Sequence, residues 1–131
     1  MAKGKILVVD DEADVRDLIK LQLEEKGLNT LEAVDGQNAI DILKSGDNMV
    51  NVGLILCDIR MPKVNGVECI RFLREQAPGI PVVVITGYPD PGLANDLKEK
   101  GVKEYLVKPV TKEKLLAVVE EQIAAGKDFK F

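Results

Sequence analysis

The stretch Ile6-Leu7-Val8-Val9-Asp10-Asp11 sets an unbroken apolar run directly before two carboxylates. Four consecutive apolar residues, three of them β-branched, are typical of a strand buried on both faces, as in a parallel sheet. Charge at the end of such a strand falls at the carboxyl edge of the sheet, where open α/β folds place their sites. The stretch therefore indicates a fold class and a candidate site together.

Runs of strand length recur along the chain and alternate with segments of helical spacing. Strands are expected at residues 6–9, 29–34, 52–57, 82–85 and 102–107. Helices are expected between them, at about residues 14–26, 37–44, 66–76 and 93–100, with a fifth after Thr111. The alternation predicts a single α/β domain over residues 1–131, with a doubly wound parallel sheet of five strands covered by helices on both faces.

Glycine and hydroxyl residues mark the expected helix ends. Gly27 suits the C-terminal cap of the first helix, and Gly101 terminates the fourth. Thr111 is the expected N-cap of the fifth helix. Residues 45–48 are expected to form a polar loop, and residues 127–131 either a flexible tail or the start of a linker.

The apolar stripes of the first and fourth helices differ in width. The first helix is expected to carry an apolar stripe of four residues, Val15, Leu18, Ile19 and Leu23. The fourth helix offers only a narrow stripe, Leu93, Ala94 and Leu97. A narrow stripe buries little apolar surface, so we expect the fourth helix to be the least firmly anchored.

The composition of the 131-residue chain excludes several classes of function. A formal charge of -4 and a pI near 4.9 argue against direct nucleic-acid binding, which needs clustered Lys and Arg. The absence of histidine excludes a Ser-His-Asp triad and a histidine-ligated metal. No apolar run approaches a membrane span and the N-terminus has no signal-peptide pattern, so we expect a cytoplasmic protein. Cys57 and Cys69 lack a metal-ligand spacing and are predicted to be reduced core residues.

Charged residues also follow two later apolar runs. Asp58 comes after residues 54–57, and Lys108 comes after residues 105–107. Parallel strands would gather both with Asp10 and Asp11 at one edge of the sheet. Each residue alone has an ordinary explanation as a helix-entry, turn or surface charge, but their conjunction favours a site. Together they carry a formal charge of -2, and an oxygen-only ligand set favours Mg²⁺ or Mn²⁺.

A carboxylate beside a metal ion and a lysine suits covalent phosphoryl transfer. Asp58 is the predicted nucleophile because it stands alone at its strand end. Asp11 is predicted to bind the metal directly, and Asp10 to act through water or to orient the ligands. Lys108 would neutralise oxygens of the transferring group, and the Thr86 hydroxyl at the end of the fourth strand would donate to one of them.

Four motifs, each at the end of its own strand, together resemble the receiver domain of two-component response regulators. They are Val8-Val9-Asp10-Asp11-Glu12, Asp58-Ile59-Arg60-Met61-Pro62 with Gly66 eight residues after the aspartate, Thr86-Gly87, and Tyr105-Leu106-Val107-Lys108-Pro109. The resemblance covers about residues 5–124. It implies a flavodoxin-like fold with strand order 2-1-3-4-5.

The resemblance also implies roles for the site residues. A sensor histidine kinase would donate a phosphoryl group from its phosphohistidine to Asp58, and the chain would catalyse this transfer and its own dephosphorylation. Mg²⁺ would be held by Asp11, Asp58 and the backbone carbonyl of Arg60, with Asp10 in support. Thr86 would then move toward the phosphoryl group.

The implied switch changes a surface that would bind a partner. The aromatic Tyr105 would turn inward and alter the surface formed by the fourth helix, the last strand and the fifth helix. That surface would control an unknown output domain or protein, or pair with a second copy in a homodimer. The narrow stripe of the fourth helix suits such a bistable element.

Two large side chains, Arg60 and Tyr88, stand two residues after Asp58 and Thr86. These positions vary in the family, and we expect both side chains to crowd the line of water attack and lengthen the phosphorylated lifetime. A pseudo-receiver that acts by protein binding alone is the main alternative. An aspartate-nucleophile phosphohydrolase would need Asp-x-Asp after its first strand, where this chain has Asp10-Asp11-Glu12.

Overall fold

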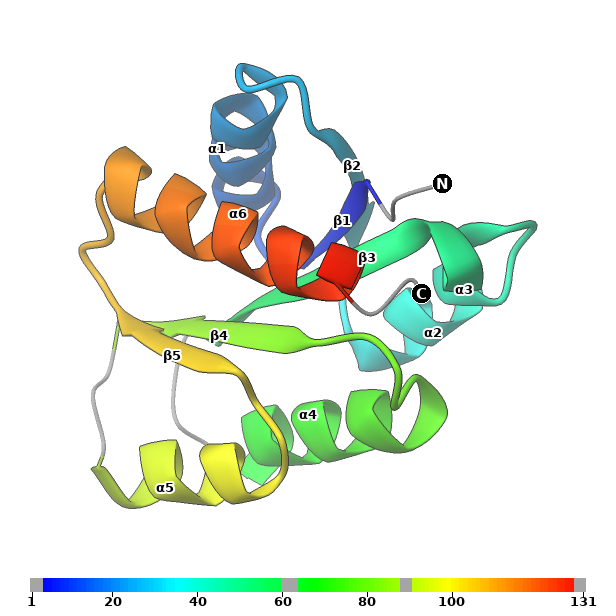
Figure 1. Cartoon of the computed structure of the whole chain (residues 1–131). Helices are drawn as coiled ribbons and strands as arrows, with labels where there is room; N and C mark the ends of the chain where they lie inside the picture. The colour runs from blue at the N-terminus through cyan, green and yellow to red at the C-terminus, as the bar shows by residue number, and fades with distance from the viewer. Residues whose placement is uncertain (1–3, 60–63, 88–90, 129–131) are drawn as a thin grey trace.

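The computed structural model describes residues 4–59, 64–87 and 91–128. Its strands form one parallel sheet in the order β2-β1-β3-β4-β5 (Figure 1). The strands are β1 (Lys5–Val9), β2 (Asn29–Ala33), β3 (Val52–Ile59), β4 (Val82–Thr86) and β5 (Glu104–Val107). The helices are α1 (Ala13–Glu24), α2 (Gly36–Leu43), α3 (Asn48–Asn51), α4 (Val64–Gln76), α5 (Pro91–Glu99) and α6 (Lys112–Asp128). The predicted fold class and strand order are confirmed.

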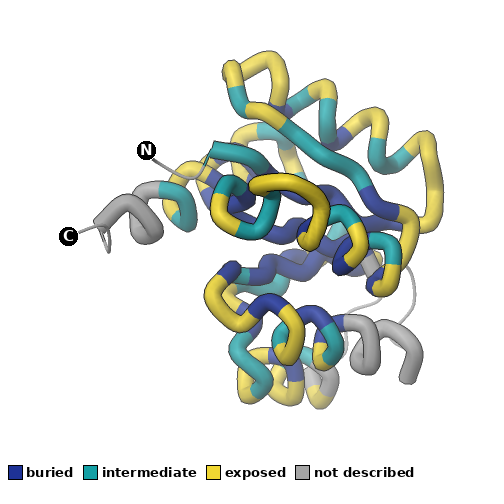
Figure 2. Tube along the Cα trace, turned by 90° about the vertical axis from the view of Figure 1, so that its right-hand side faces the viewer, coloured by how far each residue is buried: buried dark blue, intermediate teal, exposed yellow. Residues whose placement is uncertain are grey.

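Helices cover both faces of the sheet because successive strand residues point to opposite sides. Ile6 and Val8 pack with residues of α1 and α6 on one face. Leu7 and Val9 pack with residues of α2, α4 and α5 on the other. Figure 1 shows α1 and α6 together on one side, with α4 and α5 opposite them. In Figure 2 the strands run through the middle as a buried layer, and exposed residues lie on the outer surfaces of the helices.

The structure confirms three predicted helix ends. Gly27 has a φ of 80°, and the following Leu28 N–H donates to the Leu23 carbonyl at 3.3 Å. Only a residue without a Cβ adopts this left-handed conformation at little cost, which explains glycine there. Gly101 has a φ of 96° after α5. The Thr111 hydroxyl caps α6 by accepting from the Lys114 N–H at 3.1 Å.

Some predicted bounds were wrong. Residues 45–48 do not form only a loop, because Asn48 begins the one-turn helix α3. Helix α4 begins at Val64 rather than Gly66. Helix α6 continues through Gly126 to Asp128, where a tail or linker was expected. A glycine costs a helix interior only about 1 kcal/mol relative to alanine, so it need not end a long helix. Residues 129–131 lie outside the described residues.

The apolar stripe predicted for the first helix is only partly buried in α1. Ile19 and Leu23 are buried, but Leu18 is 56% exposed. On α5, Leu97 is fully buried and Ala94 is half-buried, whereas the side chain of Leu93 lies outside the described residues. Cys57 is buried in β3 as predicted, and the side chain of Cys69 is not described. None of the helices in the described ranges is long and apolar enough to cross a membrane.

Candidate functional site

The strand register brings the charged strand ends together. Val9 pairs with Cys57, so Asp10 and Asp58 follow side by side on neighbouring strands. Asp58 in turn pairs with Ile85 on β4, immediately before Thr86. The Lys108 N–H donates to the Thr86 carbonyl at 2.7 Å, which places the lysine at the same edge. The parallel strands in this register thus bring together four residues, Asp10, Asp58, Thr86 and Lys108.

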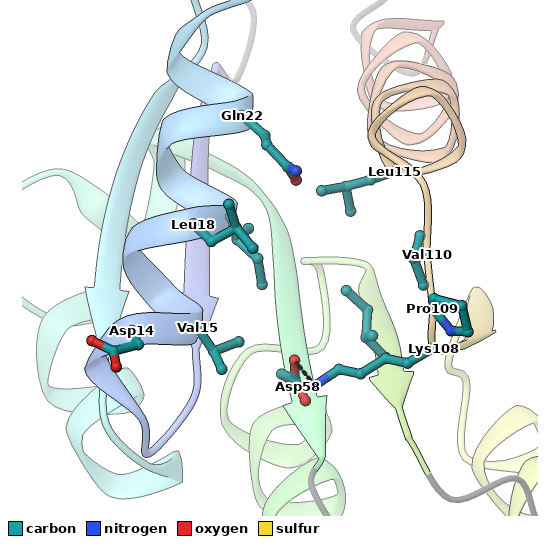
Figure 3. Close-up of a pocket in the computed structure, with 11 residues that line it drawn as sticks. Asp14, Val15, Leu18, Gln22, Asp58, Lys108, Pro109, Val110 and Leu115 are labelled. Carbon is teal, nitrogen blue, oxygen red and sulfur yellow. Dashed lines mark ion pairs between the residues drawn. The ribbon is translucent and has the colours of Figure 1, made fainter.

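Asp58 and Lys108 form an ion pair at the carboxyl edge. Lys108 Nζ lies 2.8 Å from Asp58 Oδ2, and the side chain of the aspartate is 1% exposed while that of the lysine is 36% exposed. Lys108 reaches Asp58 from the end of β5, and its peptide bond to Pro109 is cis (Figure 3). In the described part of the chain, Asp58 Oδ1 has no hydrogen-bond partner. One carboxylate oxygen is therefore paired with a cation, and the other is buried without a partner among the described residues.

Asp10 is buried beside Asp58, and Asp11 is exposed. Asp10 Oδ1 accepts from the Glu12 N–H at 2.7 Å. Its second oxygen, Oδ2, is buried and has no hydrogen-bond partner within the described residues. An unpartnered buried carboxylate oxygen is costly unless something pairs with it, so this oxygen marks a position where a cation would be favourable.

Burial is the main cause that raises the pKa of both buried carboxyls. Burial, then the charges of Asp58 and Asp11, raise the pKa of Asp10 to about 7, although Lys108 acts in the opposite direction. Burial is also the main cause that raises the pKa of Asp58, and the Lys108 ammonium opposes it. The site therefore holds more negative charge than its one lysine compensates.

A divalent cation would offset this excess negative charge. The unpartnered oxygens of Asp10 and Asp58 are hard ligands of the kind that Mg²⁺ prefers, so the described residues fit such an ion. They do not form a ready-made cage: among the described residues, no three His, Cys, Asp or Glu side chains are gathered closely enough to hold a metal by themselves. Mg²⁺ usually keeps several waters, which suits an open site. The predicted carbonyl ligand of Arg60 lies outside the described residues.

Two other predicted site residues lie on β4 and β5. Thr86 is fully buried at the end of β4, and a Cβ on the neighbouring Gly87 would lie 3.7 Å from Lys108 Cδ. Tyr105 on β5 is half-buried and packs against the core on the α4 and α5 face. Its hydroxyl is buried without a hydrogen-bond partner among the described residues. Tyr88 lies outside the described residues.

A groove runs from the acidic edge between α1 and α6. It has a volume of about 620 Å³. Figure 3 shows Asp58 and Lys108 at one end, with side chains of α1 on one side and those of Pro109, Val110 and Leu115 on the other. The exposed Leu18 lines it, which explains why this leucine is not packed in the core.

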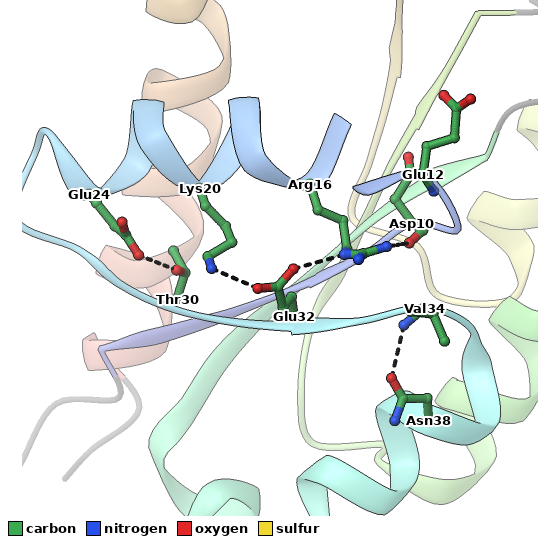
Figure 4. A network of polar contacts seen from close by, with 9 residues as sticks. All are labelled: Asp10, Glu12, Arg16, Lys20, Glu24, Thr30, Glu32, Val34 and Asn38. Carbon is green, nitrogen blue, oxygen red and sulfur yellow. Dashed lines mark hydrogen bonds and ion pairs between the residues drawn. The ribbon is translucent and has the colours of Figure 1, made fainter. Parts of the chain in front are cut away.

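Sequence reasoning missed a charged network behind the acidic edge. Glu32 on β2 accepts from Arg16 Nε and from Lys20 Nζ, both at 2.8 Å (Figure 4). Arg16 Nη1 also donates to the Asp10 carbonyl at 2.7 Å. A glutamate inside a predicted strand, facing two cations one helical turn apart, was the signal in the sequence.

The chain is similar to known receiver domains. Residues 6–120 match the response regulator receiver domain family. The transcriptional regulatory protein FixJ of Bradyrhizobium diazoefficiens is 31% identical over 121 residues, 92% of this chain and 57% of that protein. The autoinducer sensor kinase/phosphatase CqsS of Vibrio cholerae is 32% identical over 86% of this chain but only 16% of its own length. The chain thus spans little more than half of the first relative and a small part of the second.

Solved structures support the same grouping. A response regulator receiver domain protein from Clostridium thermocellum is 31% identical, with a TM-score of 0.82 over 95% of this chain and 97% of that one. A CheX-CheY-BeF3-Mg complex from Borrelia burgdorferi contains a chain that is 28% identical, with a TM-score of 0.78 over 89% of this chain and 87% of that one. The match over residues 6–120, the strand order and the acidic edge agree, and the chain belongs to the response regulator receiver domain family.

Proposed function

We propose that this chain is a phosphoacceptor switch in which Asp58 takes a phosphoryl group from the phosphohistidine of a sensor histidine kinase. The observation that carries the proposal is the buried Asp58 carboxylate, whose Oδ2 lies 2.8 Å from Lys108 Nζ and whose Oδ1 has no hydrogen-bond partner in the described chain. A carboxylate with an unpartnered oxygen beside a cation suits nucleophilic attack on phosphorus.

In the proposed step, Asp58 Oδ1 forms the new oxygen–phosphorus bond. The phosphorus–nitrogen bond of the donor breaks, and its electron pair stays on the imidazole nitrogen. Lys108, already at ion-pair distance from Asp58, then pairs with the phosphoryl oxygens. The transfer depends mainly on position and charge, which a fixed lysine and a buried aspartate supply.

Mg²⁺, or Mn²⁺ in its place, is the proposed cofactor. When bound, it would neutralise negative charge on the transferring phosphoryl group. Asp11, Asp58 and the Arg60 carbonyl would hold it, and Asp10 would support it. The excess negative charge at the edge and the magnesium in the similar Borrelia burgdorferi complex support this assignment.

The groove between α1 and α6 is the proposed docking surface for the kinase. A donor must bring its phosphoryl group to Asp58, and the groove ends at that residue. Exposed apolar side chains are available on α1, where Leu18 is 56% and Leu21 57% exposed. An apolar helix face of the kinase beside its phosphohistidine would cover them.

The output surface is proposed at α5, β5 and α6, which correspond to the fourth helix, last strand and fifth helix predicted from the sequence. Tyr105 supports this assignment because it packs against the core and also lines a surface groove of about 390 Å³ with Val107 and Lys114. A change in the Tyr105 side chain would therefore alter the groove. Thr86, buried beside Asp58, would link the phosphoryl group to that change.

The partner of this output surface is proposed by class only. It is an output domain or protein, or a second copy of the chain. We also propose a cytoplasmic location, where a sensor kinase presents its phosphohistidine. Direct nucleic-acid binding is not expected of these residues, given their formal charge of -4, although relatives include transcriptional regulators that extend well beyond the matched region.

Labelling with a small phosphodonor tests the proposal. The chain is incubated with Mg²⁺ and acetyl phosphate, and intact mass is measured before and after hydroxylamine. We expect a hydroxylamine-labile phosphoryl adduct that is lost in Asp58→Asn and kept in the control Asp47→Asn, since Asp47 is an exposed residue just before α3. No adduct, under conditions that label a known receiver, would favour the pseudo-receiver. Steady hydrolysis of phosphate esters would favour a phosphohydrolase.

A further inference from the structure

We propose that Arg16 is a positioning residue that fixes Asp10 and thereby sets the affinity of the acidic edge for a divalent cation. The inference rests on the proposed function, since it concerns the same Mg²⁺ site. Arg16 lies outside the four strand-end motifs, and it is tied to the site through hydrogen bonds rather than by facing the phosphoryl group.

The guanidinium of Arg16 bridges two elements. Its side chain leaves the first turn of α1 and is only 13% exposed. Nη1 donates to the Asp10 carbonyl at 2.7 Å, and Nε donates to Glu32 Oε1 on β2 at 2.8 Å (Figure 4). Arg16 therefore links the end of β1 to the neighbouring strand.

Asp10 is held at three points, and Arg16 supplies one of them. The Asp10 N–H donates to the Ala33 carbonyl at 3.1 Å, and its Oδ1 accepts from the Glu12 N–H at 2.7 Å. Because Arg16 also holds its carbonyl, Asp10 keeps little conformational freedom. The oxygen left over is Oδ2, which is buried and has no hydrogen-bond partner in the described chain. Groups that orient metal ligands in this way commonly change metal affinity 10- to 100-fold when altered.

The effect of Arg16 on Asp10 is one of position more than of charge. Glu32 pairs with the guanidinium, and hydrogen bonds from Lys20 and then from Arg16 lower the pKa of Glu32. The largest influences on the pKa of Asp10 are its burial and the charges of Asp58, Asp11 and Lys108. A variant that keeps the positive charge but loses the two-acceptor geometry should therefore still weaken the site.

Lysine provides that variant. Arginine presents several N–H groups in a rigid planar fork, so it reaches the Asp10 carbonyl and Glu32 at once. The ammonium of lysine is a single point on a flexible stem and cannot reproduce this arrangement. Arg16→Lys therefore separates geometry from charge.

Lys20 provides the matched control. It lies one turn further along α1 and pairs with the other oxygen of Glu32, also at 2.8 Å. Within the described residues it makes no hydrogen bond to Asp10. Lys20→Met therefore disturbs the same network without loosening the acidic edge.

The test is a calorimetric titration of the full chain with MgCl₂. The Mg²⁺ dissociation constant is expected to rise about tenfold in Arg16→Lys and to stay within about twofold in Lys20→Met. As a metal-free readout, hydrogen exchange of the Glu12 amide, which donates to Asp10, should accelerate in Arg16→Lys and not in Lys20→Met.

Three results would overturn the inference. Unchanged Mg²⁺ affinity in Arg16→Lys, with normal binding by the unaltered chain, would remove this inference and leave the proposed function intact. Equal weakening in Arg16→Lys and Lys20→Met would show a general loss of the network rather than positioning of Asp10. An unaltered chain that binds no Mg²⁺ would overturn the proposed cofactor and this inference with it.

Discussion

Helices α1 and α5 lie on opposite faces of the sheet and are held in different ways (Figure 1). Helix α1 buries Ile19 and Leu23 and is tied to β2 by side-chain hydrogen bonds from both of its cations to Glu32. Among the described residues of α5, Leu97 is the one fully buried side chain. Just past its C-terminus, the Lys100 carbonyl accepts from Arg74 Nε at 3.3 Å.

This difference suits different roles for the α1 side, which holds the acidic edge, and the α5 side, which lies at the proposed output surface. The elements that carry Asp10 are fixed to one another, which keeps the acidic edge in one geometry. On the other face, α5 has one fully buried side chain among its described residues, and it lies next to β5, which carries Tyr105. A change at Asp58 is therefore expected to move the α5 side before it moves the α1 side.

The first way to break this comparison is to remove the anchor of α5. Leu97→Ala should lower the free energy of unfolding by about 2–5 kcal/mol, because it leaves a cavity at a fully buried position. Leu18→Ala, at a position 56% exposed on α1, should change it by less than about 0.5 kcal/mol. Urea denaturation measures both, and equal losses would show that exposure does not distinguish the two positions.

The second way is to remove the cation of the site. Lys108→Ala should slow labelling by acetyl phosphate about 100-fold, since one fixed charge-stabilising group is lost at the reacting carboxylate. Lys112→Ala is the control, because Lys112 pairs with Glu25 away from Asp58. A loss smaller than about tenfold in Lys108→Ala would contradict the assigned role.

The third way concerns the burial of Asp10 close to other carboxylates. Its pKa is raised from 3.8 to about 7 in the folded chain, so the folded chain binds more protons than the unfolded one between about pH 4 and 7. The stability contribution of Asp10 therefore falls as pH rises through that window. In EDTA, Asp10→Asn should raise the free energy of unfolding by about 1–2 kcal/mol at pH 7.5 and change it little at pH 4.

Urea denaturation at both pH values checks this prediction. Asparagine keeps an oxygen that can accept from the Glu12 N–H, so the backbone contact need not be lost. Asp47→Asn is the control, since Asp47 is exposed and makes no side-chain cap to α3. A gain in Asp10→Asn that is the same at pH 4 and pH 7.5 would contradict burial and charge repulsion as its cause.

The smallest expected effect is on the phosphorylated lifetime. If Arg60 and Tyr88 crowd the line of water attack, the double variant Arg60→Ala, Tyr88→Ala should lose its phosphoryl group severalfold faster. Decay of the adduct after removal of the phosphodonor, followed by intact mass, measures the rate. An unchanged or slower decay would exclude this role for the two side chains.

The acidic edge could be predicted from the sequence because it follows from two local facts. Apolar runs end at Asp10, Asp58 and Lys108, and parallel strands bring such ends together. The strand positions and the caps at Gly27 and Thr111 could be read for the same reason, since each depends on neighbours in the sequence.

Other features depend on contacts between distant residues. The pairing of Arg16 with Glu32 spans 16 positions, so the helical spacing of Arg16 and Lys20 does not show which strand residue they bind. Leu18 shares its helical stripe with Ile19, but it lies at the edge of the stripe, over the groove rather than the sheet. The extension of α6 past Gly126 shows that a single glycine is a weak stop signal.

The central claim is that a phosphoryl group on Asp58 changes the α5 side while the α1 side stays fixed. Hydrogen exchange of the chain, with and without Mg²⁺ and acetyl phosphate, tests it most directly, with Asp58→Asn as the unphosphorylated control. The account predicts altered exchange in residues 91–107 and unchanged exchange in α1 and β2, and none of this in Asp58→Asn. Equal changes on both sides, or changes that persist in Asp58→Asn, would contradict it.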